Sequence, residues 1–339
     1  MRLIRIFILG VVALFGLIGF KAYQKKQAQK LALALIPAHA QALEEIQQPP
    51  QTVAPVKHDA QKAIQMAKKK QDGDQNETID RVWQLFTTVA KDRLPIVETI
   101  TYSSRVPWIK GRQAWIADYA SHFMTSRHFI ARSLNGKPDY FTQNVSAGDR
   151  FNVLRTDKNI NFYLLVDISL LKMWFYYLDL DQNEKVLLKT YAIGAGRLDE
   201  KGNSITPTGK YVLGDKIAIY KPGNVGYFQN QPVEMIQIFG TRWLPFKEEI
   251  GDCAKPAKGY GIHGAPCALD MESKELKEDM QSIGRYDSDG CVRLSKQDVE
   301  ELFSIVITRP TIVEIVKESY DLRQEKIDSL KVIQHQTQE

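Results

Sequence analysis

Cysteine and histidine are scarce in this 339-residue sequence, which has three cysteines and six histidines. The three cysteines share one C-terminal stretch with a single histidine: Cys253, His263, Cys267 and Cys291. No two of these cysteines stand two to four residues apart, which is the spacing typical of structural zinc sites. A Cys₃His zinc domain is therefore an alternative that lacks its usual spacing, and we predict no metal and no organic cofactor.

Aromatic residues are absent between Tyr23 and Trp83. This stretch is rich in Gln, Lys and Ala and contains the segment "QQPPQTVAP", a composition typical of spacers. We therefore predict a partly helical linker at 23–75. Apolar residues at helical spacing in 60–67 and 79–89 predict a helical hairpin.

Positive charge is in excess only near the N-terminus. The chain has a net charge of +5, but its first 75 residues hold eleven Lys/Arg against five Asp/Glu, a surplus of six. The remainder is therefore close to neutral, at about −1. A protein without a basic stripe on its folded part is not expected to bind nucleic acid.

One apolar run stands out at the N-terminus, from Ile6 to Phe20, with basic residues on both sides. Its length is adequate for a membrane-spanning helix when the flanking basic side chains reach toward the interface. We predict a transmembrane signal anchor at 1–22. A cleaved signal peptide is the alternative, although the small-residue site at 38–42 lies far beyond the apolar run.

The rest of the chain divides by pattern. Residues 76–154 mix helical and strand-like segments, and their histidines, His122 and His128, are expected at the surface or at helix ends. From 155 to 320, short strand-like runs predominate, with a turn at 181–184 and one helix that Ser295 would cap. The sequence thus predicts an α+β protein with a mostly-β C-terminal domain at 155–320 and a polar tail at 321–339.

The segment "SDGCVRLS" places Cys291 after a small-residue turn. A cysteine nucleophile needs a base that takes its proton, and His263 is the one histidine of residues 155–320. Gly290 would let the Gly290 and Cys291 amides converge on an oxyanion. A buried structural thiol is the alternative for Cys291.

Four blocks resemble the YkuD-type L,D-transpeptidase domain, in the order that this family has them. They are "LLVDISLLKMWFYYLD", "TPTGKY", "YGIHGAP" and "SDGCVRLSKQDVEELF", and the resemblance covers about 155–316. It implies a YkuD-like β-sandwich and a cysteine acyltransferase acting on peptidoglycan stem peptides. With the anchor, it also implies a single-pass protein of the bacterial inner membrane whose catalytic domain lies in the periplasm or cell envelope.

The resemblance also implies a role for each matching residue. Cys291 would be the nucleophile and His263 its base, oriented by the Gly264 carbonyl. The oxyanion site and the substrate contacts would come from the residues around them: Gly290 and Ser288 for the former, Arg293 and Tyr260 for the latter. The implied activity forms 3→3 cross-links through a thioester on tetrapeptide stems. L,D-carboxypeptidase activity, lipoprotein attachment or detachment, and a non-catalytic wall-binding module are the alternatives.

The sequence departs from the family pattern at Asp289 and in the length of the spacer between His263 and Ser288. Asp289 stands where the motif has a second histidine, and a carboxylate facing the thiol would raise its pKa, so we expect Asp289 to point away, toward Arg293. The 24-residue spacer between His263 and Ser288 is longer than usual. Its segment 270–284 looks helical and is expected to form a lid.

The two remaining cysteines enclose a short loop that carries His263. In a domain outside the cytoplasm, a Cys253–Cys267 disulfide would leave Cys291 as the unpaired thiol. Closing this loop would stabilise the fold by about 3 kcal/mol. Two free thiols are the alternative.

Overall fold

The computed structural model describes residues 79–137, 140, 145–273 and 275–319. The expected anchor at 1–22, the linker at 23–75, the first half of the helical hairpin and the tail at 321–339 lie outside these residues. Among the described residues, no helix has the length and apolar character needed to cross a membrane.

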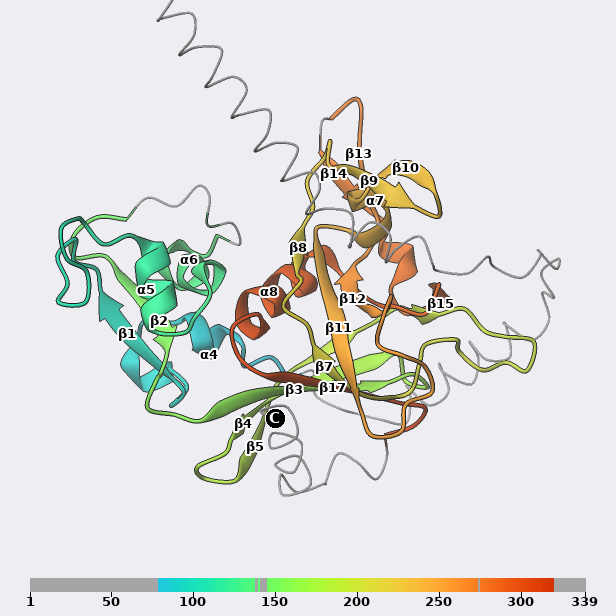
Figure 1. Ribbon diagram of the computed structural model, residues 1–339, viewed down its shortest axis with the longest axis horizontal. Coiled ribbons are helices and arrows are strands. Elements are labelled where there is room, and N and C mark those ends of the chain that lie inside the picture. The colour runs from blue at the N-terminus through green and yellow to red at the C-terminus, as the bar shows by residue number, and fades with distance from the viewer. Residues whose placement is uncertain (1–78, 138–139, 141–144, 274, 320–339) are drawn as a thin grey trace, which may run out of the picture. The chain divides into compact units, whose positions relative to one another are not determined.

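The described chain contains short helices and many strands (Figure 1). The α-helices are α4 (Trp83–Phe86), α5 (Ile116–His122), α6 (Arg127–Asn135), α7 (Ile236–Phe239) and α8 (Lys296–Val306), and two 3₁₀ turns are η1 (Ala90–Asp92) and η3 (Met280–Ser282). The strands up to β9 are β1 (Val97–Thr101), β2 (Arg150–Leu154), β3 (Ile160–Asp167), β4 (Lys172–Asp179), β5 (Glu184–Ala192), β6 (Ala195–Gly196), β7 (Gly209–Leu213), β8 (Ala218–Ile219) and β9 (Val225–Phe228). The later strands are β10 (Gln231–Glu234), β11 (Arg242–Ile250), β12 (Gly261–Gly264), β13 (Cys267–Leu269), β14 (Leu276–Glu278), β15 (Tyr286–Ser288), β16 (Val292–Leu294) and β17 (Thr311–Val316).

A nine-stranded sheet organises the mostly-β part. Its order is β16-β12-β11-β7-β17-β3-β4-β5, with β8 also paired to β11. The β3–β17 and β12–β16 pairs are parallel, and the other pairs of this sheet are antiparallel. The predicted mostly-β domain is thus confirmed. The strands form one path in which the long strand β11, with a bulge between Phe246 and Glu248, joins β7 to β12, and this curled sheet is consistent with the expected YkuD-like fold.

Strands β3 and β4 are buried along almost their whole length because both of their faces are covered. One face contributes Phe162, Leu164 and Phe175 to the main core. The other contributes Tyr163, Trp174 and three further residues to a second apolar cluster. A strand covered on both faces reads as a continuous apolar run, which is the pattern that "INFYLLVDI" shows.

Helix α8 lies against the sheet beside β11 and β12 (Figure 1). Ser295 begins it as predicted, since its Oγ accepts a hydrogen bond from the Asp298 amide at 3.1 Å. The helix buries Val299, Leu302 and Phe303 in the main core. This packing covers the back of β12, and β16 runs directly into the helix, so the core holds both strands that carry the candidate site.

The region 79–154 has a core of its own around Tyr119, Ile130 and Phe151. It also contributes residues such as Leu85 and Phe129 to the main core. Two expectations fail here. Only 83–86 of the predicted helix at 79–89 is α-helical, and His128 is buried against Phe303 rather than exposed. In both cases, contacts with distant parts of the chain override the local pattern.

Candidate active site

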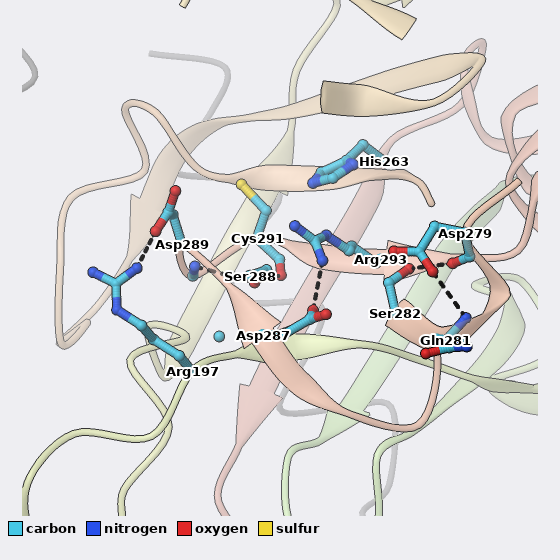
Figure 2. Close-up of polar contacts among 12 residues, drawn as sticks. Arg197, His263, Asp279, Gln281, Ser282, Asp287, Ser288, Asp289, Cys291 and Arg293 are labelled. Carbon is cyan, nitrogen blue, oxygen red and sulfur yellow. Dashed lines mark hydrogen bonds and ion pairs between the residues drawn. The ribbon is translucent and has the colours of Figure 1, made fainter. Parts of the chain in front are cut away.

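Cys291, His263 and Arg293 are brought together by the parallel pairing of β12 with β16. In this register Ile262 pairs with Val292, and His263 pairs with Arg293. Side chains two positions apart on a strand lie on the same face of the sheet, so Cys291, just before β16, faces the same side as Arg293 and His263. Figure 2 shows the Cys291 sulfur on that side, with the imidazole turned toward it. Cys291 and His263 are thus adjacent in space although they are 28 positions apart in the sequence.

His263 is almost fully buried, with 3% of its surface exposed. Its Nδ1 lies 2.7 Å from the Gly264 carbonyl oxygen, which fixes the ring orientation. The Phe239 ring packs edge-on against the imidazole at 5.3 Å. Burial lowers the pKa of His263 to about 3, and the positive charge of Arg293 lowers it further. Hydrogen bonds with the Gly264 and Phe239 backbones act in the opposite direction and raise this pKa. The imidazole is therefore neutral at physiological pH and able to accept a proton.

The Cys291 side chain is half-buried, and its Sγ lies 3.8 Å from the Gly259 carbonyl oxygen. Burial raises the pKa of this thiol to about 12. A hydrogen bond from the Gly261 amide and the charge of Arg293 act in the opposite direction, while Asp289 adds to the rise. In the resting site both groups are therefore neutral: a thiol faces an unprotonated imidazole.

This neutral pair predicts the pH dependence of Cys291 alkylation by iodoacetamide. The thiolate is the reacting species, so the rate should rise about tenfold per pH unit from pH 7 to 9 with no plateau. Mass spectrometry of the Cys291 peptide measures this rate, and the denatured protein, whose thiols titrate near 8.5, is the control. A rate that stays constant between pH 6 and 9 would show a preformed thiolate–imidazolium pair instead.

Ser288 stabilises the turn before Cys291 through two hydrogen bonds of its side chain. Its Oγ donates to the Cys291 carbonyl oxygen at 2.7 Å and accepts from the Gly290 amide at 3.1 Å. The sequence predicted that the Gly290 amide would serve an oxyanion, but in the structure this N–H is bonded to Ser288. The Cys291 amide is then the backbone donor of this turn that can serve an oxyanion.

Gly290 has two reasons to be glycine. Its φ is +113°, and a Cβ at this position would lie 2.7 Å from the ring of Tyr260. On its other side, Gly196 approaches so closely that a Cβ there would lie 2.9 Å from the Gly290 Cα. Thr206, the first residue of the "TPTG" block, holds Gly196 through a 2.7 Å hydrogen bond from the Gly196 amide to Oγ1. Tyr260 and the "TPTG" turn thus form the walls of the cysteine turn, and Tyr260 is half-buried there rather than freely exposed.

Two ion pairs flank the thiol, and they differ from the expected one. Arg293 pairs with Asp287 at 2.5 Å, and Asp289 pairs with Arg197 (Figure 2). The expectation that Asp289 would turn toward Arg293 is therefore wrong. The reason is topological, because β6 pairs with β15 and brings Arg197 beside the turn, which the local sequence could not indicate.

The three cysteines are all free thiols. Cys253 Sγ lies 3.2 Å from the Lys210 carbonyl oxygen beside β7, whereas Cys267 Sγ lies 3.3 Å from the Ala265 carbonyl oxygen. The disulfide expected between them is absent, because Cys253 lies beside β7 whereas Cys267 lies on β13, which pairs with β14 outside the nine-stranded sheet. No group of three His, Cys, Asp or Glu side chains among the described residues could hold a metal ion, so the Cys₃His alternative is not supported.

The described residues of the segment expected to form a helical lid, 270–273 and 275–284, contain no α-helix. Strands β13 and β14 pair antiparallel across it, with Cys267 opposite Glu278, and the turn η3 follows. Sequence reasoning also missed two residues that position the site. Arg197 had no signal in the sequence, and Phe239 was one apolar residue among many; both reach the site only through strand pairing and packing.

Residues 161–315 match the family model of the YkuD L,D-transpeptidase catalytic domain, and this segment is a domain of that family. The match includes the strands that carry Cys291 and His263, as well as the "TPTG" turn behind them.

The chain is also similar to individual known proteins. A Bacillus licheniformis protein named "Putative L,D-transpeptidase YkuD" is 26% identical over 189 residues, which are 55% of this chain and 85% of that protein. Among solved structures, Bdellovibrio bacteriovorus Bd1075 matches at 13% identity and a TM-score of 0.31, over 46% of this chain and 48% of that one. The helical cell shape determining protein Pgp2 of Campylobacter jejuni matches at 16% identity and a TM-score of 0.29, over 48% of this chain and 49% of that one. The chain spans about half the length of these two structures.

Proposed function

We propose that the protein is a peptidoglycan L,D-transpeptidase in which Cys291 is the nucleophile and His263 the general base. The observation that carries this proposal is the β12–β16 register, which places the thiol and a buried, neutral imidazole on one face of adjacent strands. The YkuD family match of the same segment supports the substrate class, the stem peptides of the bacterial cell wall.

The first half-reaction is acylation. His263 takes the proton of the Cys291 thiol as the sulfur attacks the carbonyl carbon of the third stem residue. The Cys291 amide stabilises the resulting oxyanion. The bond between that carbon and the D-Ala nitrogen then breaks, and the protonated His263 gives its proton to the departing amine. A thioester and free D-Ala are the products.

The acyl acceptor of the second half-reaction distinguishes a transpeptidase from a carboxypeptidase and from an enzyme that attaches lipoproteins. An amine on the third residue of a neighbouring stem attacks the thioester carbonyl and loses its proton to His263. The carbon–sulfur bond then breaks, His263 returns the proton to the Cys291 sulfur, and the product is a 3→3 cross-link. Water as the acceptor would make the protein an L,D-carboxypeptidase, and a protein amine would attach a lipoprotein. The shared acyl-enzyme serves all three acceptors, and we propose the stem amine as the principal one.

Arg293 supports this chemistry electrostatically. Arg293 carries a positive charge on the strand that adjoins His263, which favours negative charge on the sulfur. It also stabilises the neutral imidazole that acts as base. A wall-binding module without catalysis would need neither a buried neutral base nor a turn fastened at both ends by Ser288.

We also propose that the protein acts at the cell envelope, held there by the apolar segment Ile6–Phe20. The substrate supports this placement, because peptidoglycan stem peptides lie outside the cytoplasm. Fractionation of cells into membrane and soluble parts, compared with a chain that lacks residues 1–22, tests this placement.

The experiment that tests the activity is incubation of the protein with a defined tetrapeptide stem, with and without an excess of a second stem as acceptor. Mass spectrometry is expected to show release of D-Ala and a cross-linked peptide linked between third residues. Release of D-Ala without any cross-linked product would favour the carboxypeptidase. Absence of D-Ala release would reject the proposal.

A further inference from the structure

Phe239 is a half-buried aromatic residue that lies against the candidate base. Its ring packs edge-on against the His263 imidazole, with 5.3 Å between the ring centroids and 85° between the ring planes. Among the described aromatic residues, Trp243 also packs against this imidazole, at 5.9 Å. His263 is 3% exposed, whereas Phe239 and Trp243 are each partly exposed. The two rings therefore stand between the imidazole and the solvent.

Neighbouring residues hold the Phe239 ring in place. Trp243 is tilted against it at 4.8 Å, and the Tyr220 ring stacks on it at 6.0 Å. The next residue, Gly240, has a φ of +61°, and a Cβ there would lie 2.5 Å from the Ala265 carbonyl oxygen. The end of helix α7 thus approaches the end of β12 more closely than a side chain would allow, and this contact sets the ring beside the imidazole.

The charged and titratable groups around the imidazole leave solvent exclusion as the main influence on it. From β16 and the turn before it come Arg293, which is paired with Asp287, and the Cys291 thiol. Strand β11 and helix α7 contribute the two uncharged rings. Helix α8 lies behind β12, where its Glu300 pairs with Arg242. Burial is accordingly the largest cause that lowers the pKa of the imidazole, ahead of the Arg293 charge.

We propose that Phe239 is a positioning residue for the L,D-transpeptidase reaction, because its ring excludes water from His263 and keeps the imidazole an unprotonated base. An imidazole in contact with water takes up a proton at about pH 6.5, and a protonated imidazole cannot accept the thiol proton. Phe239 acts through His263, since its own ring has no proton to exchange. This inference rests on the proposed function and adds the residue that keeps the base available below neutral pH.

The first test follows the titration of His263 in the free protein by NMR of the imidazole. The signal that is missing from His263→Gln identifies this residue. In Phe239→Ala water reaches the ring, so the pKa of His263 should rise from about 3 by at least about one unit. Phe239→Leu keeps an apolar side chain at this place and should shift the titration less.

Ile238→Ala is the matched control for this titration. It shortens the preceding side chain of the same short helix, which points in another direction. The titration of His263 should therefore stay as in the wild type. Circular dichroism checks the folding of each variant, and Phe239→Leu carries the test if Phe239→Ala does not fold.

The second test separates water exclusion from packing. In the wild type the imidazole is unprotonated at both pH 5 and pH 8, so protonation of the base does not limit kcat/KM for D-Ala release at either pH. In Phe239→Ala the imidazole takes up a proton at pH 5, so the ratio of kcat/KM at pH 5 to that at pH 8 should fall several-fold below the wild-type ratio. A loss of packing alone would lower kcat/KM equally at the two pH values.

The outcomes distinguish this inference from the proposed function. An unchanged titration of His263 in Phe239→Ala, or equal losses of kcat/KM at pH 5 and pH 8, would overturn the role of Phe239 and leave the transpeptidase proposal standing. A wild-type protein that releases no D-Ala would reject the transpeptidase proposal, whereas the NMR titration would still decide whether the Phe239 ring excludes water from the imidazole.

Discussion

Replacement of Cys291 by alanine is expected to abolish D-Ala release from a tetrapeptide stem. Without the sulfur no thioester can form, and no other described thiol can replace it, since Cys253 lies beside β7 and Cys267 lies on β13. The fold should be nearly unaffected, with a change in unfolding free energy of less than about 1 kcal/mol, because the thiol is half-buried and its Sγ lies as far as 3.8 Å from the Gly259 carbonyl oxygen.

Cys267→Ala is the matched control for this experiment. Cys267 is 2% exposed and packs in the interior, so this variant should lose about 1 kcal/mol of stability and keep its activity. Thermal unfolding followed by circular dichroism, together with mass analysis of the products, measures both quantities. Full activity in Cys291→Ala would disprove the proposed nucleophile.

Replacement of His263 by glutamine is expected to lower the rate of acylation by a factor of about 10² to 10⁴, the usual contribution of a general base. Glutamine has a similar size and can donate to the Gly264 carbonyl as Nδ1 does, but it cannot accept the thiol proton. The burst of D-Ala release in a single turnover measures acylation directly. His122→Gln, at an exposed histidine stacked on Trp108, is the control and should keep the wild-type rate.

The same variant has a stability signature that depends on pH. Because the pKa of His263 is lowered to about 3, the unfolded chain binds a proton below pH 6.5 that the folded protein does not take up until near pH 3. The free energy of unfolding should therefore fall by about 1.4 kcal/mol for each pH unit by which the pH is lowered from about 6.5 to about 3. His263→Gln should remove this contribution to the pH dependence of stability. A wild-type acylation rate in His263→Gln would show that another group takes the proton.

Local sequence predicted much of the fold correctly because the signals were local. The apolar run at 160–167 and the turn at 181–184 predicted β3, β4 and β5, where Asn183 adopts the positive φ that such turns require. Ser295 marked the start of α8 through a capping interaction between residues three apart. Hydrogen bonds and apolar spacing within ten residues are enough to set elements of this kind.

Where the signal was ambiguous, the elements were assigned wrongly. Segment 270–284 has charges and apolar residues compatible with a helix, yet its described residues form β14 and the 3₁₀ turn η3, because β14 pairs across a short turn with β13, which lies just before the segment. The helix expected at 79–89 shortens to four residues, since Val82 and Leu85 are buried in the main core. Tertiary packing outweighs a weak helical preference in both segments.

The sequence by itself determined which residue types could carry the chemistry and in which family pattern they stand: Cys291 with a glycine before it, and His263 as the one histidine of residues 155–320. The tertiary structure alone decided their charge states and their neighbours. Burial makes both groups neutral, the β12–β16 register sets them on one face, and the β6–β15 pairing brings Arg197 to Asp289. Solvent exclusion and contacts between distant strands depend on the whole packed domain, so no short stretch of sequence contains them.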